Sequence, residues 1–254
     1  MPTAQDAILA RMGQHEITLG TLVKSPSLLD ALRSLLREAG ARARILQEAR
    51  TMGLEASQEE LQAAADAVRR SRKLHRAEDT HRWLQSAGLT VDDLEEEARF
   101  AVLRGKVRDR LTADRVEKHF HEHRTRFDEV LLSHLVVAEE GVARELLTQV
   151  QEDEADFGAL ARQHSLNRDT AQRAGMLGPV RRGGVRAEVE THLFSARPGH
   201  VAGPFQVKGG WELIQVVAVQ PAALDDRSRE EIRESLFHEW LDGQLARTPV
   251  QAAW

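Results

Sequence analysis

The chain of 254 residues has no cysteine and no tyrosine, and only 4% of its residues are aromatic. Without cysteine it can form neither a disulfide framework nor a catalytic thiolate. So few aromatic residues argue against a stacking platform for single-stranded nucleic acid. No apolar run reaches the length that spans a membrane. The segment from Ser27 to Gly178 also lacks proline, the commonest helix breaker, so it can hold long helices.

The charge is mixed and slightly acidic. The 35 lysines and arginines stand against 40 aspartates and glutamates, and the formal net charge of −5 does not favour nonspecific binding to nucleic acid. The basic run from Arg69 to Arg76 lies within a helical pattern and indicates a solvated helix face. The amino-terminal residues include Asp6, Arg11 and Glu16 and no apolar signal core, so we expect a cytoplasmic protein. An export protein whose signal had been removed would look similar.

Apolar residues recur every three or four positions over the first 127 residues, as they do on the buried side of consecutive helices. The clearest series are Leu28, Leu29, Leu32, Leu35, Leu36 and Ala39, then Ala43, Leu46 and Ala49. Ser57 with Glu60 forms a capping-box pattern, and Thr90 with Asp93 forms a related helix start. We therefore expect a helical region over residues 1–127.

Residues 128–220 have a different pattern, in which apolar runs of strand length alternate with helical spacing. The run Leu131–Val137 predicts a strand, and the spacing of Val142–Val150 predicts a helix. Gly209 and Gly210 stand before the apolar run Trp211–Val219, as a hairpin turn stands before a buried strand. The segment is predicted to be a small α+β domain.

Four short sequence motifs within residues 128–220 resemble those of a known protein family. They are the strand Leu131–Val137 with its histidine, Asp156–Ala161 followed by His164 and Ser165, the glycine-containing turn Ala174–Gly178, and the phrase Phe194–Pro204. In this order and at these spacings they resemble the parvulin-type peptidyl-prolyl isomerase family, also called PpiC or rotamase. The resemblance implies an antiparallel sheet flanked by helices, a polypeptide substrate that contains proline, and no cofactor.

The resemblance also implies site residues. In the family, two histidines, a Cys or Asp and often a Ser or Thr form a polar floor, beside a pocket that holds the proline ring. The first histidine falls at His134, the Cys or Asp at Asn167, and the second histidine at Glu212. The remaining substrate-binding positions fall at Leu177, Val185, Val189, Phe194 and Ala202.

His134, Leu177 and Phe194 match the family, and the other site positions depart from it. Valine in place of a pocket phenylalanine loses contact with a proline ring worth about 1 kcal/mol. We therefore expect a degraded site with weak or absent turnover. The alternatives are a buried structural histidine at His134, a turn-forming Asn167, and core roles for Leu177 and Phe194.

The helical part resembles the amino-terminal chaperone module of the SurA and PrsA foldases. The matching phrases are Glu16–Leu19, Glu48–Leu54, and Ala87–Leu89 followed by Asp93 and Leu94. In that family the chain returns after the isomerase to complete the helical module, and Ile232, Leu236 and Trp240 have the spacing to do so. The expected organisation is a helical domain over 1–127, a parvulin-like domain over 128–220 inserted into it, and a closing helix within 221–254.

Two functions follow as hypotheses. The first is a peptide-binding foldase or chaperone with uncertain isomerase activity, and the second is an inactive escort for one dedicated precursor or client enzyme. Either would bind unfolded or proline-containing polypeptide, with neither nucleic acid nor membrane as partner, and could form a homodimer. His119, His121 and His123 could offer two nitrogens to a metal, but ordinary polar helix positions explain them better, so no metal is expected.

Overall fold

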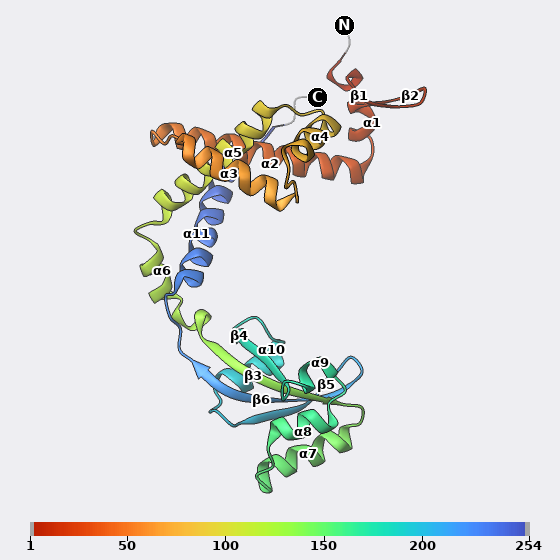
Figure 1. The fold of residues 1–254 in the computed structure, drawn as a ribbon, viewed down its shortest axis with the longest axis vertical. Helices are drawn as coiled ribbons and strands as arrows, with labels where there is room; N and C mark the ends of the chain where they lie inside the picture. The colour runs from red at the N-terminus through yellow and green to blue at the C-terminus, as the bar shows by residue number, and fades with distance from the viewer. Residues whose placement is uncertain (1–2, 252–254) are drawn as a thin grey trace. The chain divides into compact units, whose positions relative to one another are not determined.

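Two compact units share the chain in the computed structural model, which describes residues 3–251 (Figure 1). The first, called the helical unit, contains the residues up to Val116 together with those from Glu230 onward, and the second, called the sheet unit, spans Glu117–Arg229. Both ends of the chain therefore build the helical unit. This confirms the predicted insertion of an α+β domain into a helical one, while the boundaries at 127/128 and 220/221 stay predictions.

The helical unit contains one short 3-10 turn, η1 (Ala4–Asp6), and six α-helices among its described residues. The helices are α1 (Leu19–Val23), α2 (Pro26–Thr51), α3 (Gln58–Ser71), α4 (Ala77–Ala87), α5 (Val91–Thr112) and α11 (Asp226–Arg247), whose first residues belong to the sheet unit. Both predicted capping boxes are present. Ser57 and Glu60 exchange hydrogen bonds at the start of α3, and Thr90 and Asp93 do so at the start of α5.

The first residues form a β-hairpin, so the expectation of an entirely helical region over 1–127 is wrong there. Strand β1 (Ile8–Met12) pairs antiparallel with β2 (His15–Thr18), and Met12 faces His15 across the turn. Gly13 lies in this two-residue turn with a φ of +61°, a value that glycine adopts without steric cost. The sequence signal that could have indicated this hairpin is Gly13, which stands between residues without helical periodicity.

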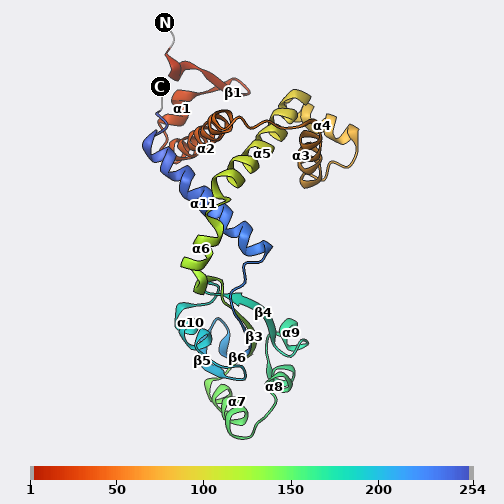
Figure 2. The same cartoon turned by 90° about the vertical axis from the view of Figure 1, so that its left-hand side faces the viewer.

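The core of the helical unit joins the two ends of the chain. Ile45 and Ala49 from α2, Leu103 and Val107 from α5, and Phe237 from α11 form one buried cluster. Ile232 and Leu236 are also buried, and Trp240 packs against the cluster. The predicted apolar stripe of the closing helix is therefore confirmed, and Figure 2 shows α11 crossing α5.

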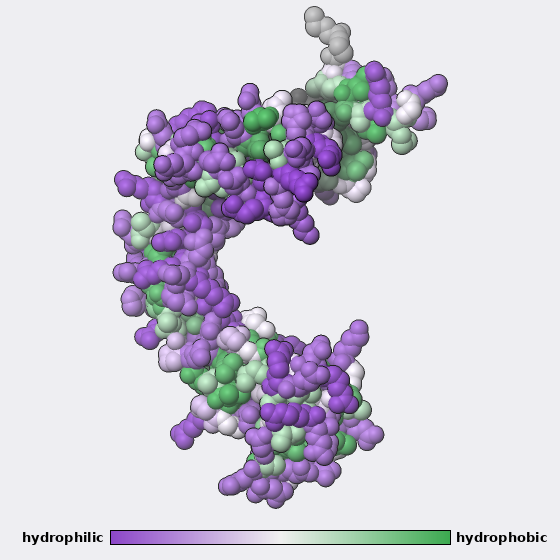
Figure 3. Space-filling view, in the orientation of Figure 1, coloured by the Kyte–Doolittle hydropathy of each residue, from purple (hydrophilic) through white to green (hydrophobic). Residues whose placement is uncertain are grey.

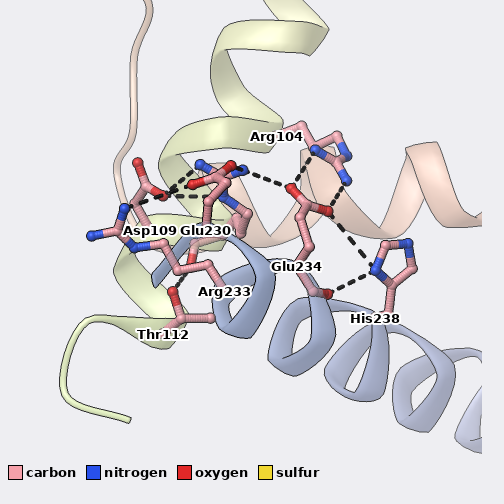
Figure 4. A network of polar contacts seen from close by, with 8 residues as sticks. Arg104, Asp109, Thr112, Glu230, Arg233, Glu234 and His238 are labelled. Atoms are coloured by element: carbon pink, nitrogen blue, oxygen red, sulfur yellow. Dashed lines mark hydrogen bonds and ion pairs between the residues drawn. The ribbon is translucent and has the colours of Figure 1, made fainter. Parts of the chain in front are cut away.

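A group of charged side chains adds polar contacts between α5 and α11 (Figure 4). Glu234 accepts hydrogen bonds from Arg104 at 2.8 Å and from Arg108 at 2.6 Å. Arg108 also bonds Glu230 and Asp109. Burial would raise the pKa of Glu234, but the hydrogen bonds from Arg104 and Arg108 outweigh it and hold this pKa below its usual value. The carboxylate of Glu234 is thus stabilised in its charged form.

Replacing Glu234 by glutamine is expected to lower the free energy of unfolding by about 2 kcal/mol at neutral pH, since charge-assisted hydrogen bonds are lost. Because the folded-state pKa lies below the ordinary value of 4.5, the carboxylate stabilises the fold above that pH. Its contribution disappears as the pH falls through the folded-state pKa. Urea unfolding followed by helix circular dichroism should therefore show a wild-type advantage at pH 7 that shrinks toward pH 3.

Glu239→Gln is the matched control, because Glu239 lies on the same helix with a side chain 72% exposed and 3.6 Å from Arg115. It should change stability little at either pH. An equal loss from both variants, or a Glu234→Gln deficit that persists undiminished at pH 3, would contradict the assigned role of Glu234.

The sheet unit is an α+β domain built on an antiparallel sheet. Its strands are β3 (Glu129–Val137), β4 (Met176–Arg181), β5 (Val201–Val207) and β6 (Gly210–Gln220), in the order β4-β3-β6-β5. Its helices and 3-10 turn are α6 (Val116–Glu122), η2 (Arg124–Phe127), α7 (Glu140–Glu152), α8 (Phe157–His164), α9 (Arg168–Ala171) and α10 (Ala187–Phe194). His134 on β3 and Leu213 on β6 lie on paired strands, as predicted.

Helices cover both faces of this sheet (Figure 1). Leu135, Val137 and Leu213 pack with α7 and α8 on one face. Alternate residues of the same strands, among them Leu132 and Ile214, pack with α10 on the other face. The second face also bears His134, because it lies two residues beyond Leu132 on β3.

The surface that Figure 3 draws is mostly hydrophilic, with smaller apolar areas among the polar side chains. Within residues 3–251, none of the helices combines the length and the apolar character that crossing a membrane requires.

Candidate functional site

His134, which is only 6% exposed, forms a polar group with Glu212, Thr170 and Asn167. Its Nδ1 lies 2.6 Å from Oε1 of Glu212, and its Nε2 lies 2.9 Å from the hydroxyl of Thr170. The side-chain nitrogen of Asn167 is 3.5 Å from the same Nε2. The fold thus brings together the three predicted catalytic residues, His134, Asn167 and Glu212, which are far apart in the sequence.

Glu212 takes part in a second contact. Its Oε2 accepts a hydrogen bond from Arg186 at 3.2 Å, and Arg186 also bonds Glu188 at 2.8 Å and the backbone oxygen of Gln206 at 3.0 Å. A carboxylate therefore occupies the position at which the family has its second histidine. Replacement of that histidine does not leave His134 without a polar partner.

Sequence reasoning missed Thr170 and Arg186. Thr170 is buried in the first turn of α9, where its N–H donates to Oδ1 of the capping residue Asn167 at 3.3 Å. An Asn three residues before a Thr is a helix-start pattern, and it could have placed Thr170 beside Asn167. No comparable signal pointed to Arg186, because its position depends on the loop between β4 and α10.

The turn before β4 holds the backbone of His134. The N–H of His134 donates to the backbone oxygen of Gly175 at 2.8 Å, and the hydroxyl of Ser133 donates to that of Ala174 at 2.6 Å. Gly175 has a φ of +78°, and a Cβ there would lie 2.2 Å from the backbone oxygen of His134. Only glycine allows this close approach.

Most of the predicted substrate-binding residues lie in one apolar cluster. Val189 and Ala202 are buried members of it, and Val185 and Phe194 pack against them. The expected fifth residue, Leu177, lies outside this cluster on β4 and is 44% exposed, so it has no core role.

The apolar cluster and the polar group share one face of the sheet. His134 and Ala202 each pair with Ile214, so the three residues form one row across β3, β6 and β5. Side chains directly opposite one another on paired strands point to the same face. The partly exposed members, Val185 and Phe194 of the apolar cluster and Asn167 beside His134, are the side chains that a bound peptide could contact.

The three histidines that were considered as metal ligands lie on α6 or directly after it. The rings of His119 and His123 stack with their centroids 4.3 Å apart. Within residues 3–251, no group of three or more potential metal ligands lies close enough together to hold an ion.

The helical unit has a cavity of about 520 Å³ between α3, α4 and the start of α5. It is lined by Val68, Ser71, Arg72, Trp83, Leu89, Asp93, Leu94 and Glu97. The guanidinium of Arg72 lies 4.6 Å from the centre of the Trp83 ring. Aliphatic and indole walls with a few charged groups are typical of sites that hold a ligand side chain.

Comparison with known proteins finds a family model and relatives that match part of the chain. The family model described as "Rotamase: PPIC-type PPIASE domain" matches residues 138–218. The foldase protein PrsA of Caldanaerobacter subterraneus is 26% identical over 117 residues, which are 46% of this chain and 38% of that protein. The chaperone SurA of Albidiferax ferrireducens is 34% identical over 104 residues, which are 39% of this chain and 22% of that protein. The matched part of the chain thus spans less than half the length of these relatives.

A solved structure extends the likeness to the whole fold. The crystal structure of a peptidylprolyl isomerase, PrsA from Bacillus cereus, has a TM-score of 0.50 with this chain at 16% identity. The match covers 99% of this chain and 95% of that one. At this identity the likeness shows the fold alone, in which a sheet domain is inserted into the sequence of a helical one.

Proposed function

Because the chain carries a parvulin-type (PpiC) domain within a helical architecture like that of SurA and PrsA, we propose that it is a foldase that binds extended polypeptide and isomerises prolyl bonds slowly. The observation that carries the proposal is the row His134, Ile214 and Ala202, which joins the polar group to the apolar cluster. A prolyl peptide needs both kinds of surface.

The reaction requires no bond to form or break. The planar amide is separated from its twisted form by about 18–20 kcal/mol, and a site catalyses the rotation by binding the twisted form better than the planar one. The partly exposed residues of the apolar cluster, Val185 and Phe194, can contact the prolyl ring, and hydrogen-bonding groups beside them can favour the twisted amide. The polar group around His134 is suited to the second task.

Slow turnover is proposed because the apolar side of the site is small. Val185, Val189 and Ala202 replace the methionine, phenylalanine and serine that the family resemblance leads us to expect. The two valines remove contact area with a prolyl ring, and the loss of a phenyl ring costs about 1 kcal/mol or more. Ala202 removes a hydroxyl. The polar contacts of His134 support retention of some turnover.

The cavity of the helical unit supports polypeptide binding independently of isomerisation. Trp83 and Leu89 offer apolar contact there, and Leu89 is 41% exposed. We include in the proposal that unfolded segments bind this cavity with an apolar side chain. The second candidate function, an escort for one client, is favoured by the reduced pocket around Val189. A homodimer and a cytoplasmic location stay predictions.

Isomerase turnover is the direct test. Magnetisation transfer between the cis and trans forms of a proline-containing peptide should show exchange that is slow compared with an active parvulin. His134→Ala should abolish it, because Thr170 and Glu212 then lose their shared partner. His164→Ala is the control, since His164 lies on exposed α8 surface and should not affect exchange.

A titration of the same peptide completes the test. Binding without exchange would favour the escort, and turnover equal to an active parvulin would contradict the reduced-site argument. Failure to bind any unfolded or proline-containing peptide would contradict both functions.

A further inference from the structure

The side-chain amide of Asn167 carries a hydrogen that neither His134 nor Thr170 accepts. Its Oδ1 accepts from the backbone N–H of Thr170, so a flipped amide would set two donors against each other. The amide nitrogen therefore faces Nε2 of His134, at 3.5 Å. Of its two hydrogens only one can point at that nitrogen. The other has no partner among residues 3–251, and Asn167 is only half-buried, whereas His134 and Thr170 are buried.

His134, by contrast, has no free N–H to offer. The carboxylate of Glu212 is an acceptor, so Nδ1 of His134 carries a hydrogen and donates it. In the neutral ring Nε2 is then an acceptor, and the hydroxyl of Thr170, whose one hydrogen can reach this nitrogen at 2.9 Å or the backbone oxygen of Asn167 at 3.3 Å, lies beside it. Both ring nitrogens are thus engaged within the group. The contribution of His134 is to hold the residues around it.

These contacts form a continuous chain from a partly exposed arginine to the amide. Arg186 holds one oxygen of Glu212, the other oxygen holds His134, and His134 contacts Thr170 and Asn167. Arg186 is itself fixed by Glu188 and by the backbone oxygen of Gln206. The N–H of Thr170 fixes the side-chain oxygen of Asn167, and the contacts that run back to Arg186 fix the imidazole that the amide nitrogen faces.

We infer that Asn167 donates the hydrogen bond that a prolyl peptide receives in this site, and that Arg186, Glu212, His134 and Thr170 are positioning residues for its amide. The inference rests on the proposed isomerase function. Twisting the peptide bond ends the delocalisation of the prolyl nitrogen lone pair, and this lone pair can then accept a hydrogen bond. A donor placed there stabilises the twisted form more than the planar one.

Asn167→Asp tests the donor. Aspartate has the shape of asparagine and keeps an oxygen for the N–H of Thr170, but it removes the amide hydrogens. Exchange of a prolyl peptide should fall at least about tenfold, as when one preorganised donor is removed. The family resemblance makes the opposite prediction, because aspartate is one of the residues it leads us to expect at this position. Unchanged or faster exchange in Asn167→Asp would overturn the inference.

Gln163→Glu is the control for the new charge, since Gln163 is an exposed amide on α8 of the same unit. It should leave exchange unchanged. Hydrogen exchange of the Thr170 amide verifies that the aspartate still caps α9.

Arg186→Met tests the positioning chain, with ¹⁵N spectra of the His134 ring as a readout separate from activity. The wild type should show a hydrogen on Nδ1 and an acceptor at Nε2. Arg186→Met should shift these signals and reduce exchange by about threefold or more, and Arg186→Lys should restore most of both. Arg144→Met, which breaks an exposed Arg–Glu pair on α7, should do neither. A neutral ring protonated at Nε2 in the wild type, or an unchanged spectrum in Arg186→Met, would overturn the chain.

The outcomes separate the inference from the proposed function. A wild-type protein that catalyses no exchange contradicts the isomerase proposal alone. Peptide binding then decides the role of Asn167. Weaker binding of the prolyl peptide by Asn167→Asp would support the donor, and equal binding would overturn it.

Discussion

Replacing Phe237 by alanine is expected to lower the free energy of unfolding of the helical unit by about 3–5 kcal/mol. Phe237 is 1% exposed and joins α11 to the buried residues of α2 and α5. The substitution removes a fully packed ring and leaves a cavity where the two ends of the chain meet. Hydrogen exchange should therefore accelerate in α2 and α5, although the substituted residue lies on neither helix.

Phe157→Ala provides the reciprocal control, because Phe157 is equally buried in the core of the sheet unit. It should accelerate exchange in β3 and α7 and leave α2 protected. If Phe237→Ala changed protection in the sheet unit as much as in the helical unit, the role of α11 as a part of the helical unit would be contradicted.

Replacing Gly175 by alanine is expected to cost more than about 3 kcal/mol in the sheet unit and to remove isomerase turnover. A Cβ would lie 2.2 Å from the backbone oxygen of His134 and 3.0 Å from the hydroxyl of Ser133. Either the turn or strand β3 must move, and both hold His134 in place. Urea unfolding and the magnetisation-transfer assay measure the two effects.

Gly178→Ala separates backbone strain from this clash. Gly178 also has a positive φ, of +100°, but a Cβ there meets nothing within 4 Å. Its cost should stay near 1–2 kcal/mol, the strain of a left-handed backbone alone. Similar losses in both variants would show that the close approach to His134 contributes little.

The sequence by itself determined the local elements and the type of domain. Capping pairs such as Ser57 with Glu60 act within one turn, and the nearly continuous apolar run Leu131–Val137 is typical of a strand with two buried faces, so both could be predicted from neighbouring residues. The return of the chain end to the helical unit was also predictable, because the stripe of Ile232 and Leu236 needs an apolar partner. The hairpin at Ile8–Thr18 was missed because its strands are short and largely exposed.

For the site, the sequence identified several of the residues but not the contacts between them. His134, Asn167 and Glu212 could be named from the positions they occupy in a family pattern, but their contacts could not, because a side chain's partners depend on which strands and turns meet in space. Thr170 reaches His134 through the turn of α9, and Arg186 reaches Glu212 from a loop 26 residues away. Only the tertiary structure decided that a glutamate and a threonine complete the contacts of His134, since a hydrogen bond is set by distance and direction rather than by sequence order.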